Sequence, residues 1–370
     1  MEKISVIGIG RLGLCMALSL AKAGFSVLGV DLDSAYIDSL NAKKFNALEP
    51  KVNEYLRSVT TFEATTSLQD GLEYAKLILI CVPTPNGGGD DFYDHSILTN
   101  LLTRINSQRP SNKDFVVCCT VMPKFCDQVG SALLEDCQNC TLSYNPEFIA
   151  QGNIIAGFEN PDMILIGEGS KDVGDRLESL YQKVCKSSPR ICRMRRLEAE
   201  IVKLSVNGFI TTKIAYANMI GEACDRTGAD AKTVLSAVGS DSRIGSKYFQ
   251  AGLSYGGPCF PRDTQALSLF LSSTGVSPTI PKATHTSNEE HIDFHVQELL
   301  QSGASSFEFK NVCYKEGSTV AIIDESPKLK IAKKLVKLGK TVTIIDTQPL
   351  ILEVKKKYGN IFKYQLAQTS

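Results

Sequence analysis

The sequence predicts an α/β protein with a parallel sheet first, a long helix in the middle and a second, smaller α/β segment at the end. Short apolar runs alternate with helical patterns over the first half of the 370 residues, which is typical of a parallel sheet covered on both faces. An unbroken helical pattern follows from residue 197 to about residue 224, and a helix and a strand return near the C-terminus. We expect domains over residues 1–195, 196–300 and 301–370.

The composition favours a small-molecule ligand. The 40 basic and 40 acidic residues cancel and no run of lysine and arginine stands out, so neither a nucleic acid nor an anionic membrane is expected as a partner. The 12 cysteines form no paired framework, no apolar run reaches membrane-spanning length, and the N-terminus enters a strand without a signal peptide. These features favour a reducing, cytoplasmic compartment.

The first strand leads into a glycine-rich turn. Residues 4–7 are apolar, Gly8-Ile9-Gly10-Arg11-Leu12-Gly13 follows at once, and a helical pattern occupies residues 14–22. In this setting the glycines permit a tight turn and a close approach of a pyrophosphate to the backbone. A second strand at 26–30 ends at Asp31, whose carboxylate can accept from ribose hydroxyls and would repel a 2′-phosphate. We therefore predict a Rossmann domain that binds a dinucleotide, with NAD favoured over NADP and over a flavin.

Further apolar strands follow, and the loops after parallel strands carry function in such folds. These strands are expected at residues 77–82, 115–119 and 163–167. Thr84 lies in a rigid turn between two prolines, which suits it to line the cofactor, although a plain loop is nearly as good an interpretation. Thr120 begins the next loop. Glu147 lies in an irregular segment, where a solvated side chain is the more common outcome and a functional carboxylate is the alternative.

The long helix carries Glu200, Lys203 and Asn207 on one face, because Lys203 and Asn207 are i,i+4 neighbours. At about 1.5 Å per residue this helix is about 40 Å long and forms a natural backbone for a dimer. The alternative is an ordinary solvated stripe, which is the commoner outcome for glutamate and lysine at this spacing.

One cysteine stands in an unusual turn, Ser254-Tyr255-Gly256-Gly257-Pro258-Cys259-Phe260-Pro261-Arg262-Asp263. The glycines and prolines exclude a regular ladder, so we expect an exposed loop that presents Cys259. The helix that follows carries Asp263 in its first turn, and the dipole at a helix N-terminus stabilises a thiolate. Cys259 is therefore a candidate nucleophile, and a structural turn with a buried free cysteine is the alternative.

Two groups of candidate metal ligands are weak. His285, His291 and His295 lie close together in the sequence but lack a further well-spaced ligand. Cys137 and Cys140 form a single C-x-x-C without a mate. We therefore expect no metal site.

Taken in order, these motifs resemble the nucleotide-sugar 6-dehydrogenases, the family of UDP-glucose and GDP-mannose dehydrogenases, over nearly the whole chain. Several independent motifs in one order are far more specific than any single one. They are Gly8-Ile9-Gly10-Arg11-Leu12-Gly13, Val82-Pro83-Thr84-Pro85, Asn145-Pro146-Glu147-Phe148, Glu200-Ile201-Val202-Lys203 with Asn207, Asp241-Ser242-Arg243-Ile244-Gly245, the turn from Gly256 to Asp263, and Glu325-Ser326-Pro327.

The resemblance implies an NAD-dependent, four-electron oxidation of a sugar C6 alcohol to the carboxylate, in the synthesis of carbohydrate or polysaccharide precursors. An aldehyde has no second hydride to give until a nucleophile adds, so Cys259 would form a thiohemiacetal, which is oxidised to a thioester and hydrolysed. The implied catalytic residues are Cys259, Asp263 as activator of the thiol or water, Lys203 as stabiliser of the oxyanion, Glu147 as acid and base, Asn207 as a sugar-holding group, and Thr120 acting on Glu147 through a water.

The resemblance also implies binding residues. Those for NAD are Gly8, Gly10, Arg11, Leu12, Gly13, Asp31, Thr84, Thr120, Gln151 and Arg262. Those for the nucleotide sugar, with a UDP-hexose favoured, are Glu147, Phe148, Lys203, Asn207, Arg243, Tyr255 and Gly256. Arg243 resembles an arginine that reaches a neighbouring subunit's substrate, so a homodimer formed through the central helix is the expected active unit.

The C-terminal segment departs from the family pattern. In the family, a strand, here expected at residues 311–315, should lead through a short loop to an arginine before Glu325. Here the loop is longer, and Asp324 stands in place of the arginine. A carboxylate at this position would repel the cofactor's phosphates. The chain also stops at Ser370, so a shortened nucleotide-sugar domain is expected. Smaller departures are Gln151 for an acidic residue, Arg262 for lysine, and Met122-Pro123 where a glycine is usual.

Two other functions stay open. One is a two-electron dehydrogenase of the hydroxy-acid or phosphogluconate kind, which would use Lys203 and Asn207 without a covalent step. The other is a catalytically impaired relative that binds nucleotide sugars, which Asp324 and the short C-terminus suggest. Two NADH per substrate would favour the four-electron route, and one NADH would favour the two-electron route.

Overall fold

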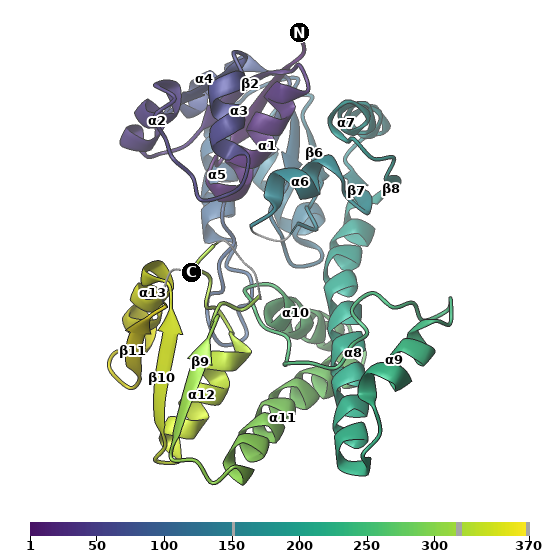
Figure 1. Cartoon of the computed structure of the whole chain (residues 1–370). Coiled ribbons are helices and arrows are strands. Elements are labelled where there is room, and N and C mark those ends of the chain that lie inside the picture. The colour runs from purple at the N-terminus through teal and green to yellow at the C-terminus, as the bar shows by residue number, and fades with distance from the viewer. Residues whose placement is uncertain (150–151, 316–319, 368–370) are drawn as a thin grey trace. The chain divides into compact units, whose positions relative to one another are not determined.

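The structure is a computed structural model that describes residues 1–149, 152–315 and 320–367 (Figure 1). The chain forms two compact units, Met1–Lys203 and Leu204–Ser370. The boundary falls within the helix α8 (Arg196–Thr227). The division into three domains at residues 195 and 300 stays a prediction.

The first unit is built on an eight-stranded sheet with the strand order β3-β2-β1-β4-β5-β6-β7-β8. Neighbouring strands are parallel except β6 and β7, which are antiparallel. The chain winds outward from β1 in both directions, as in a doubly wound Rossmann sheet, and this confirms the predicted fold class. The strands are β1 (Lys3–Ile7), β2 (Ser26–Val30), β3 (Phe62–Thr65), β4 (Leu77–Ile80), β5 (Asp114–Val117), β6 (Thr141–Tyr144), β7 (Met163–Glu168) and β8 (Arg190–Arg195).

Helices cover both faces of this sheet, and the strand side chains alternate between two apolar cores. In β4, Leu77 and Leu79 join one core, while Ile78 and Ile80 join the other. Burial on both faces explains why the central strands are apolar throughout. The helices are α1 (Arg11–Lys22), α2 (Ser34–Asn41), α3 (Val52–Ser58), α4 (Leu68–Tyr74), α5 (Ser96–Ser107), α6 (Ile154–Glu159) and α7 (Lys171–Val184), with a π-helical segment η1 (Phe125–Gly130) and a 3-10 turn η2 (Ala132–Leu134) after β5.

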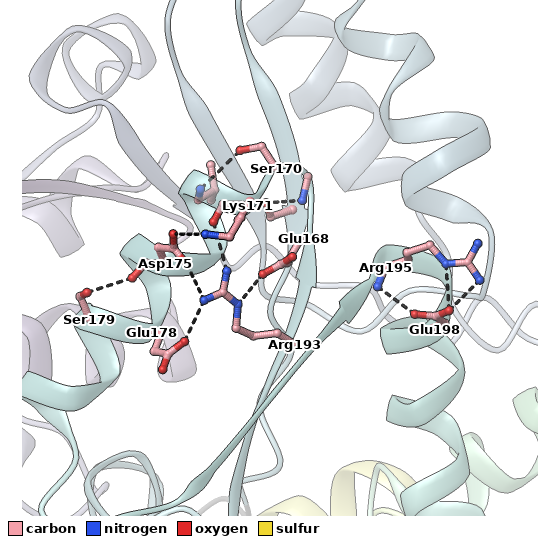
Figure 2. Close-up of polar contacts among 12 residues, drawn as sticks. Glu168, Ser170, Lys171, Asp175, Glu178, Ser179, Arg193, Arg195 and Glu198 are labelled. Atoms are coloured by element: carbon pink, nitrogen blue, oxygen red, sulfur yellow. Dashed lines mark hydrogen bonds and ion pairs between the residues drawn. The ribbon is translucent and has the colours of Figure 1, made fainter.

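The edge strand β8 is polar, and Arg193 holds it against its neighbours (Figure 2). The guanidinium pairs with Glu168 on β7 over 2.5 Å and with Asp175 and Glu178 on α7 over 2.5 and 2.8 Å. Charged residues on an edge strand discourage pairing with another chain. Arg193 therefore closes this side of the sheet and fixes α7 beside it.

The second unit combines helices with a three-stranded parallel sheet of order β11-β10-β9. Side chains from α11, α12, α13 and β10 form its apolar core. Its elements after α8 are α9 (Ala231–Gly239), α10 (Phe260–Ser273), α11 (Thr279–Gln301), β9 (Ser306–Lys310), α12 (Pro327–Lys337), β10 (Thr341–Asp346), α13 (Gln348–Tyr358) and β11 (Lys363–Leu366). The predicted C-terminal helix and strand are confirmed as α12 and β10.

The long central helix is confirmed as α8, which spans 32 residues. At about 1.5 Å per residue its length is about 48 Å. Within the described ranges, neither α8 nor any other helix combines the length and the apolar character that crossing a bilayer requires.

The strand predicted at residues 311–315 is wrong, because the strand is β9, which ends at Lys310. In β9 the half-buried Phe307 and Phe309 alternate with exposed residues, as in a strand buried on one face. Asn311 then takes a left-handed φ of 53°, which ends the ladder. The N–H of Val312 donates to the carboxylate of Asp346 over 2.8 Å instead of to a strand.

Candidate active site

The turn after β1 requires glycine at two positions. Gly8 has a φ of +88°, and a Cβ there would lie 3.0 Å from the backbone of Cys81. A Cβ on Gly13 would lie 2.0 Å from the Gly8 carbonyl oxygen. Gly10 is the N-cap residue of α1, and no side chain caps this helix end. Since the N–H groups and the positive dipole of a helix N-terminus bind phosphates, the turn suits a dinucleotide pyrophosphate.

The other side chains of this turn lie at the start of α1, where Arg11 is exposed and Leu12 is half-buried. Asp31 directly follows β2, and the parallel pairing of Ile7 with Val30 brings it to the same sheet edge. Its Oδ1 accepts from the N–H of Leu32 over 2.8 Å. A carboxylate at this edge suits the ribose hydroxyls of NAD.

Thr84 and Thr120 connect the loops after β4 and β5. The hydroxyl of Thr84 donates to the carbonyl oxygen of Thr120 over 2.8 Å. Nε2 of His95 accepts from the N–H of Met122 over 3.2 Å, and burial lowers the pKa of His95, which favours the neutral ring that can accept. The loop after Thr120 is therefore held in place by His95, although it lacks the usual glycine.

The segment after β6 places Glu147 beside Lys203. Nζ of Lys203 donates to the carbonyl oxygen of Glu147 over 2.5 Å and lies 4.5 Å from the ring centroid of Phe148. The hydroxyl of Tyr181 lies 3.0 Å from Oε1 of Glu147. Burial raises the pKa of Glu147 to about 7, although the Tyr181 hydrogen bond and the Lys203 charge oppose the rise. A carboxyl group with such a pKa can exchange protons near neutral pH.

The interpretation of Glu200 and Lys203 as a solvated stripe is wrong, since they are 0% and 7% exposed. The carboxylate of Glu200 accepts from the N–H groups of Lys124 and Cys126 over 2.6 and 2.8 Å. Glu200 therefore fixes the start of η1, the segment that follows the Thr120 loop.

Cys259, in the second unit, is exposed and is the N-cap residue of α10. Its carbonyl oxygen accepts from the N–H of Asp263 over 2.8 Å. The other cysteines that the structure describes are buried or half-buried. The predicted exposure of Cys259 before a helix is confirmed, and the alternative of a buried cysteine is wrong. The loop itself was expected to be exposed, but residues 254–257 are buried, so that part of the prediction is wrong.

Asp263 lies in the first turn of α10 and is 1% exposed. Nδ2 of Asn207 donates to Oδ2 of Asp263 over 2.6 Å. Arg262 is half-buried in the same helical turn. The predicted residues Asn207, Cys259, Arg262 and Asp263 therefore lie together around the start of α10.

Two buried asparagines hold the loop before Cys259. Asn288 on α11 accepts from the N–H of Tyr255 over 2.8 Å and donates to its carbonyl oxygen over 3.2 Å. Asn218 on α8 accepts from the N–H of Gly252 over 2.9 Å and donates to the carbonyl oxygen of Leu253 over 3.3 Å. This loop is thus fixed to both helices through its main chain.

The two glycines of the loop contact the segment before α12. A Cβ on Gly256 would lie 2.2 Å from the carbonyl oxygen of Glu325. The N–H of Gly257 donates to the carbonyl oxygen of Asp324 over 3.0 Å. Asp324 thus supports the loop through its main chain, and repulsion between its carboxylate and the cofactor's phosphates stays a prediction.

The histidines of α11 also support this loop. His291 pairs with Glu222 over 2.5 Å through Nδ1 and lies 2.7 Å from the carbonyl oxygen of Gly252 through Nε2. Nε2 of His295 lies 3.1 Å from Nε2 of His291. In the ranges that the structure describes, no group of three or more histidine, cysteine or acidic side chains is arranged to hold a metal ion.

The last two predicted residues are Gln151 and Arg243. Gln151 lies outside the described residues. Arg243 is exposed, and its guanidinium pairs with Asp241 over 2.7 Å.

Sequence reasoning missed four supporting residues: Asn145, Tyr181, Asn218 and Asn288. Asn145 stands in a recognised motif, but no role was assigned to it. The sequence could have indicated Asn218 and Asn288. Asparagine is disfavoured in the interior of a helix, so an asparagine there often makes a specific hydrogen bond.

The NAD-binding-domain model of the UDP-glucose/GDP-mannose dehydrogenase family matches residues 2–185, and the central-domain model of the same family matches residues 197–290. The chain is 29% identical over 349 residues to a UDP-glucose 6-dehydrogenase of Rickettsia bellii, covering 91% of this chain and 79% of the relative. It is 28% identical over 351 residues to a GDP-mannose 6-dehydrogenase of Pseudomonas savastanoi, with the same coverage.

A solved structure gives the same result. The UDP-glucose dehydrogenase of the archaeon Pyrobaculum islandicum matches with a TM-score of 0.88 and 28% identity, covering 98% of this chain and 86% of that chain. The glycine turn, Asp31 and the sheet topology fit the NAD-binding role of the first family model. This chain is therefore a member of the UDP-glucose/GDP-mannose dehydrogenase family, the NAD-dependent nucleotide-sugar 6-dehydrogenases.

Proposed function

We propose that the protein oxidises the C6 alcohol of a nucleotide sugar to the carboxylate in two NAD-dependent steps, through a covalent intermediate on Cys259. The observation that carries this proposal is the exposed thiol of Cys259 at the N-terminus of α10, with the buried carboxylate of Asp263 one turn further on. The proposed substrate is a UDP-hexose, with UDP-glucose first because relatives of that name are among the similar proteins.

In the first step the C6 alcohol becomes an aldehyde. NAD, when bound at the glycine turn, supplies the hydride acceptor. The ammonium group of Lys203 stabilises negative charge on the C6 oxygen, since a buried cation interacts more strongly than a solvated one. The ionised form of Glu147 takes the hydroxyl proton, and a pKa of about 7 leaves a large share of this carboxyl group ionised near neutral pH.

In the second step the Sγ of Cys259 bonds to the aldehyde carbon and the aldehyde oxygen gains a proton, which gives a thiohemiacetal. Loss of a hydride from C6 and of that proton gives a thioester. Water then adds to the thioester carbon, the C–S bond breaks, and the carboxylate and the free thiol are formed. Asp263, held by Asn207, activates the thiol or the water.

We also propose a homodimer formed through α8, in which Arg243 reaches the substrate of the neighbouring subunit. Three large apolar side chains on α8 are exposed: Phe209 at 68%, Tyr216 at 49% and Met219 at 50%. Their spacing places them on one side of the helix. Exposed apolar rows of this kind mark interaction surfaces.

NADH formation by the purified protein tests this function. UDP-glucose, GDP-mannose and their N-acetylhexosamine analogues are offered one at a time with excess NAD, and turnover is expected on UDP-glucose. Turnover with one NADH per sugar would favour the two-electron dehydrogenase. Binding of NAD without turnover of any donor would favour the catalytically impaired relative.

A further inference from the structure

Asn145, Tyr181 and Glu147 form a row of three polar side chains within the first unit. The hydroxyl oxygen of Tyr181 lies 2.6 Å from Oδ1 of Asn145 and 3.0 Å from Oε1 of Glu147. Asn145 and Tyr181 are both 2% exposed. Asn145 directly follows β6 and Tyr181 belongs to α7, so two separate elements converge on Glu147.

The orientation of the Asn145 amide is fixed by its other partner. Nδ2 of Asn145 donates to the carbonyl oxygen of Leu165 on β7 over 2.8 Å. A carbonyl oxygen can only accept, so the NH2 group must face Leu165 and Oδ1 must face Tyr181. The main-chain N–H of Asn145 donates to the carbonyl oxygen of Val117 over 2.8 Å, which fixes the backbone as well. Asn145 therefore offers Tyr181 an acceptor and no donor.

The charge of Glu147 depends on how many protons are available for the two hydrogen bonds of the Tyr181 hydroxyl. Burial and the neighbouring Glu147 raise the pKa of Tyr181 well above its usual value, so the phenol keeps its single proton. Oδ1 of Asn145 and an ionised Glu147 both only accept. With Glu147 ionised, one of the two oxygen–oxygen contacts of Tyr181 would have no proton. A protonated Glu147 resolves this conflict, because it donates to Tyr181 while Tyr181 donates to Asn145.

We propose that Asn145 and Tyr181 are positioning residues that favour the protonated form of Glu147 in the resting protein. When Glu147 gives up its proton, the Tyr181 hydroxyl rotates from Asn145 to Glu147, and Oδ1 of Asn145 loses its donor. The lost hydrogen bond at a buried acceptor opposes ionisation. The inference deepens the proposed acid and base role of Glu147, on which it rests.

The other titratable groups that interact with Glu147 do not supply this effect. Lys203 on α8 favours the ionised form. Burial raises the pKa of Cys185, at the end of α7, to about 11, so this thiol stays neutral. Hydrogen bonding with Cys81 and burial raise the pKa of Cys118, after β5, well above its usual value. A hydrogen bond from Tyr181 by itself lowers the pKa of Glu147. The effect proposed here therefore comes from Asn145, which competes with Glu147 for the single proton of Tyr181.

Infrared titration of the full-length protein tests the proposal without substrate. The carbonyl stretching band of protonated Glu147 is assigned by its absence in Glu147→Gln, and its intensity is followed against pH. Asn145→Leu removes the competing acceptor, so the pKa of Glu147 should fall by about one unit. In a Tyr181→Phe background, Asn145→Leu should cause no such fall. An unchanged or higher pKa in Asn145→Leu, or the same fall without the Tyr181 hydroxyl, would overturn the proposal.

A second measurement needs no change at Asn145, in case Asn145→Leu does not fold. In the unmodified protein labelled with 15N, the side-chain amide signal of Asn145 should shift with the same midpoint as Glu147 titrates, and this shift should vanish in Tyr181→Phe. Tyr55→Phe is the matched control, because the buried Tyr55 hydroxyl contacts Glu159 elsewhere in the same unit. An Asn145 signal that does not follow Glu147 would refute the relay.

These spectra also separate the relay from the function on which it rests. If the relay titrates as expected but Glu147→Gln turns over nucleotide sugar at an unchanged rate, the catalytic role of Glu147 is wrong and the relay stands. If Glu147→Gln is inactive but the Asn145 signal is independent of Glu147, the relay is wrong and the catalytic role stands.

Discussion

Nδ2 of Asn207 donates to Oδ2 of Asp263 over 2.6 Å and links α8 to the first turn of α10. Asp263 is 1% exposed, and an ionised carboxylate at such depth requires hydrogen-bond donors. Asn207 therefore holds the Asp263 carboxylate, which is proposed to activate Cys259 or water. This contact predicts the effect of placing a second carboxylate at position 207.

Asn207→Asp should destabilise the protein in a pH-dependent way. Two carboxylates at this distance repel each other when both are ionised, so the variant is best tolerated when one of them is protonated. We expect the free energy of unfolding to fall by about 3 kcal/mol at pH 8 and by less at pH 5, measured by urea denaturation. Asn207→Ala is the control: it removes the donor without adding a charge, so its loss should depend on pH less than the loss in Asn207→Asp. A pH-independent loss in Asn207→Asp would contradict the geometry.

The raised pKa of Glu147 predicts a stability change between about pH 4.5 and pH 7. Over this range the folded protein binds a proton that the unfolded chain has released, so stability falls as the pH rises and levels off above pH 7. Relative to Glu147→Gln, the unmodified protein should lose about 3 kcal/mol from pH 4.5 to pH 8. Urea denaturation of both proteins across this range measures the difference, and parallel pH profiles would refute the shift.

Gly256→Ala should destabilise the loop that carries Cys259. The new Cβ would lie 2.2 Å from the carbonyl oxygen of Glu325, which is backbone and cannot move aside easily. We expect a loss of about 2–3 kcal/mol in thermal or urea denaturation and a fall in kcat. Gly252→Ala is the matched control in the same loop, because nothing lies within 4 Å of its Cβ. If Gly256→Ala and Gly252→Ala lose the same free energy of unfolding, the contact between Gly256 and Glu325 is not as described.

Phe209→Glu should dissociate the proposed dimer. A charge placed among the exposed apolar side chains of α8 would be buried without a partner on association. Sedimentation velocity at micromolar concentration should give a dimer for the unmodified protein and a monomer for this variant. Leu352→Glu on α13 is the control, since Leu352 is an exposed apolar residue of a different helix. An unmodified protein that sediments as a monomer, or a Phe209→Glu dimer, would contradict the proposal.

Local patterns were enough to predict the parts of the fold and site that depend on neighbouring residues. The strand, glycine turn and helix from residue 4 to residue 22, with Asp31, follow from one short stretch of chain. The exposed position of Cys259 follows from the glycines and prolines around it. In each case the backbone conformation is restricted by the residues themselves.

Burial produced by distant contacts could not be predicted in this way. Glu200 reads as a solvated residue, yet it is buried because Lys124 and Cys126 present N–H groups to it. Tyr181 looks like an ordinary apolar helix position, and only the folded chain brings its hydroxyl to Glu147. The strand predicted at residues 311–315 fails for a similar reason, because Val312 finds its acceptor in Asp346.

The most direct test of the central claim is the number of NADH formed per molecule of limiting UDP-glucose, compared between the unmodified protein and Cys259→Ser. The unmodified protein and the control Cys140→Ser should each give two NADH and the uronic acid. Cys259→Ser should stop at one NADH or fewer, because the aldehyde cannot lose a second hydride without the thiol. Formation of two NADH and the uronic acid by Cys259→Ser at the unmodified rate would contradict the covalent route.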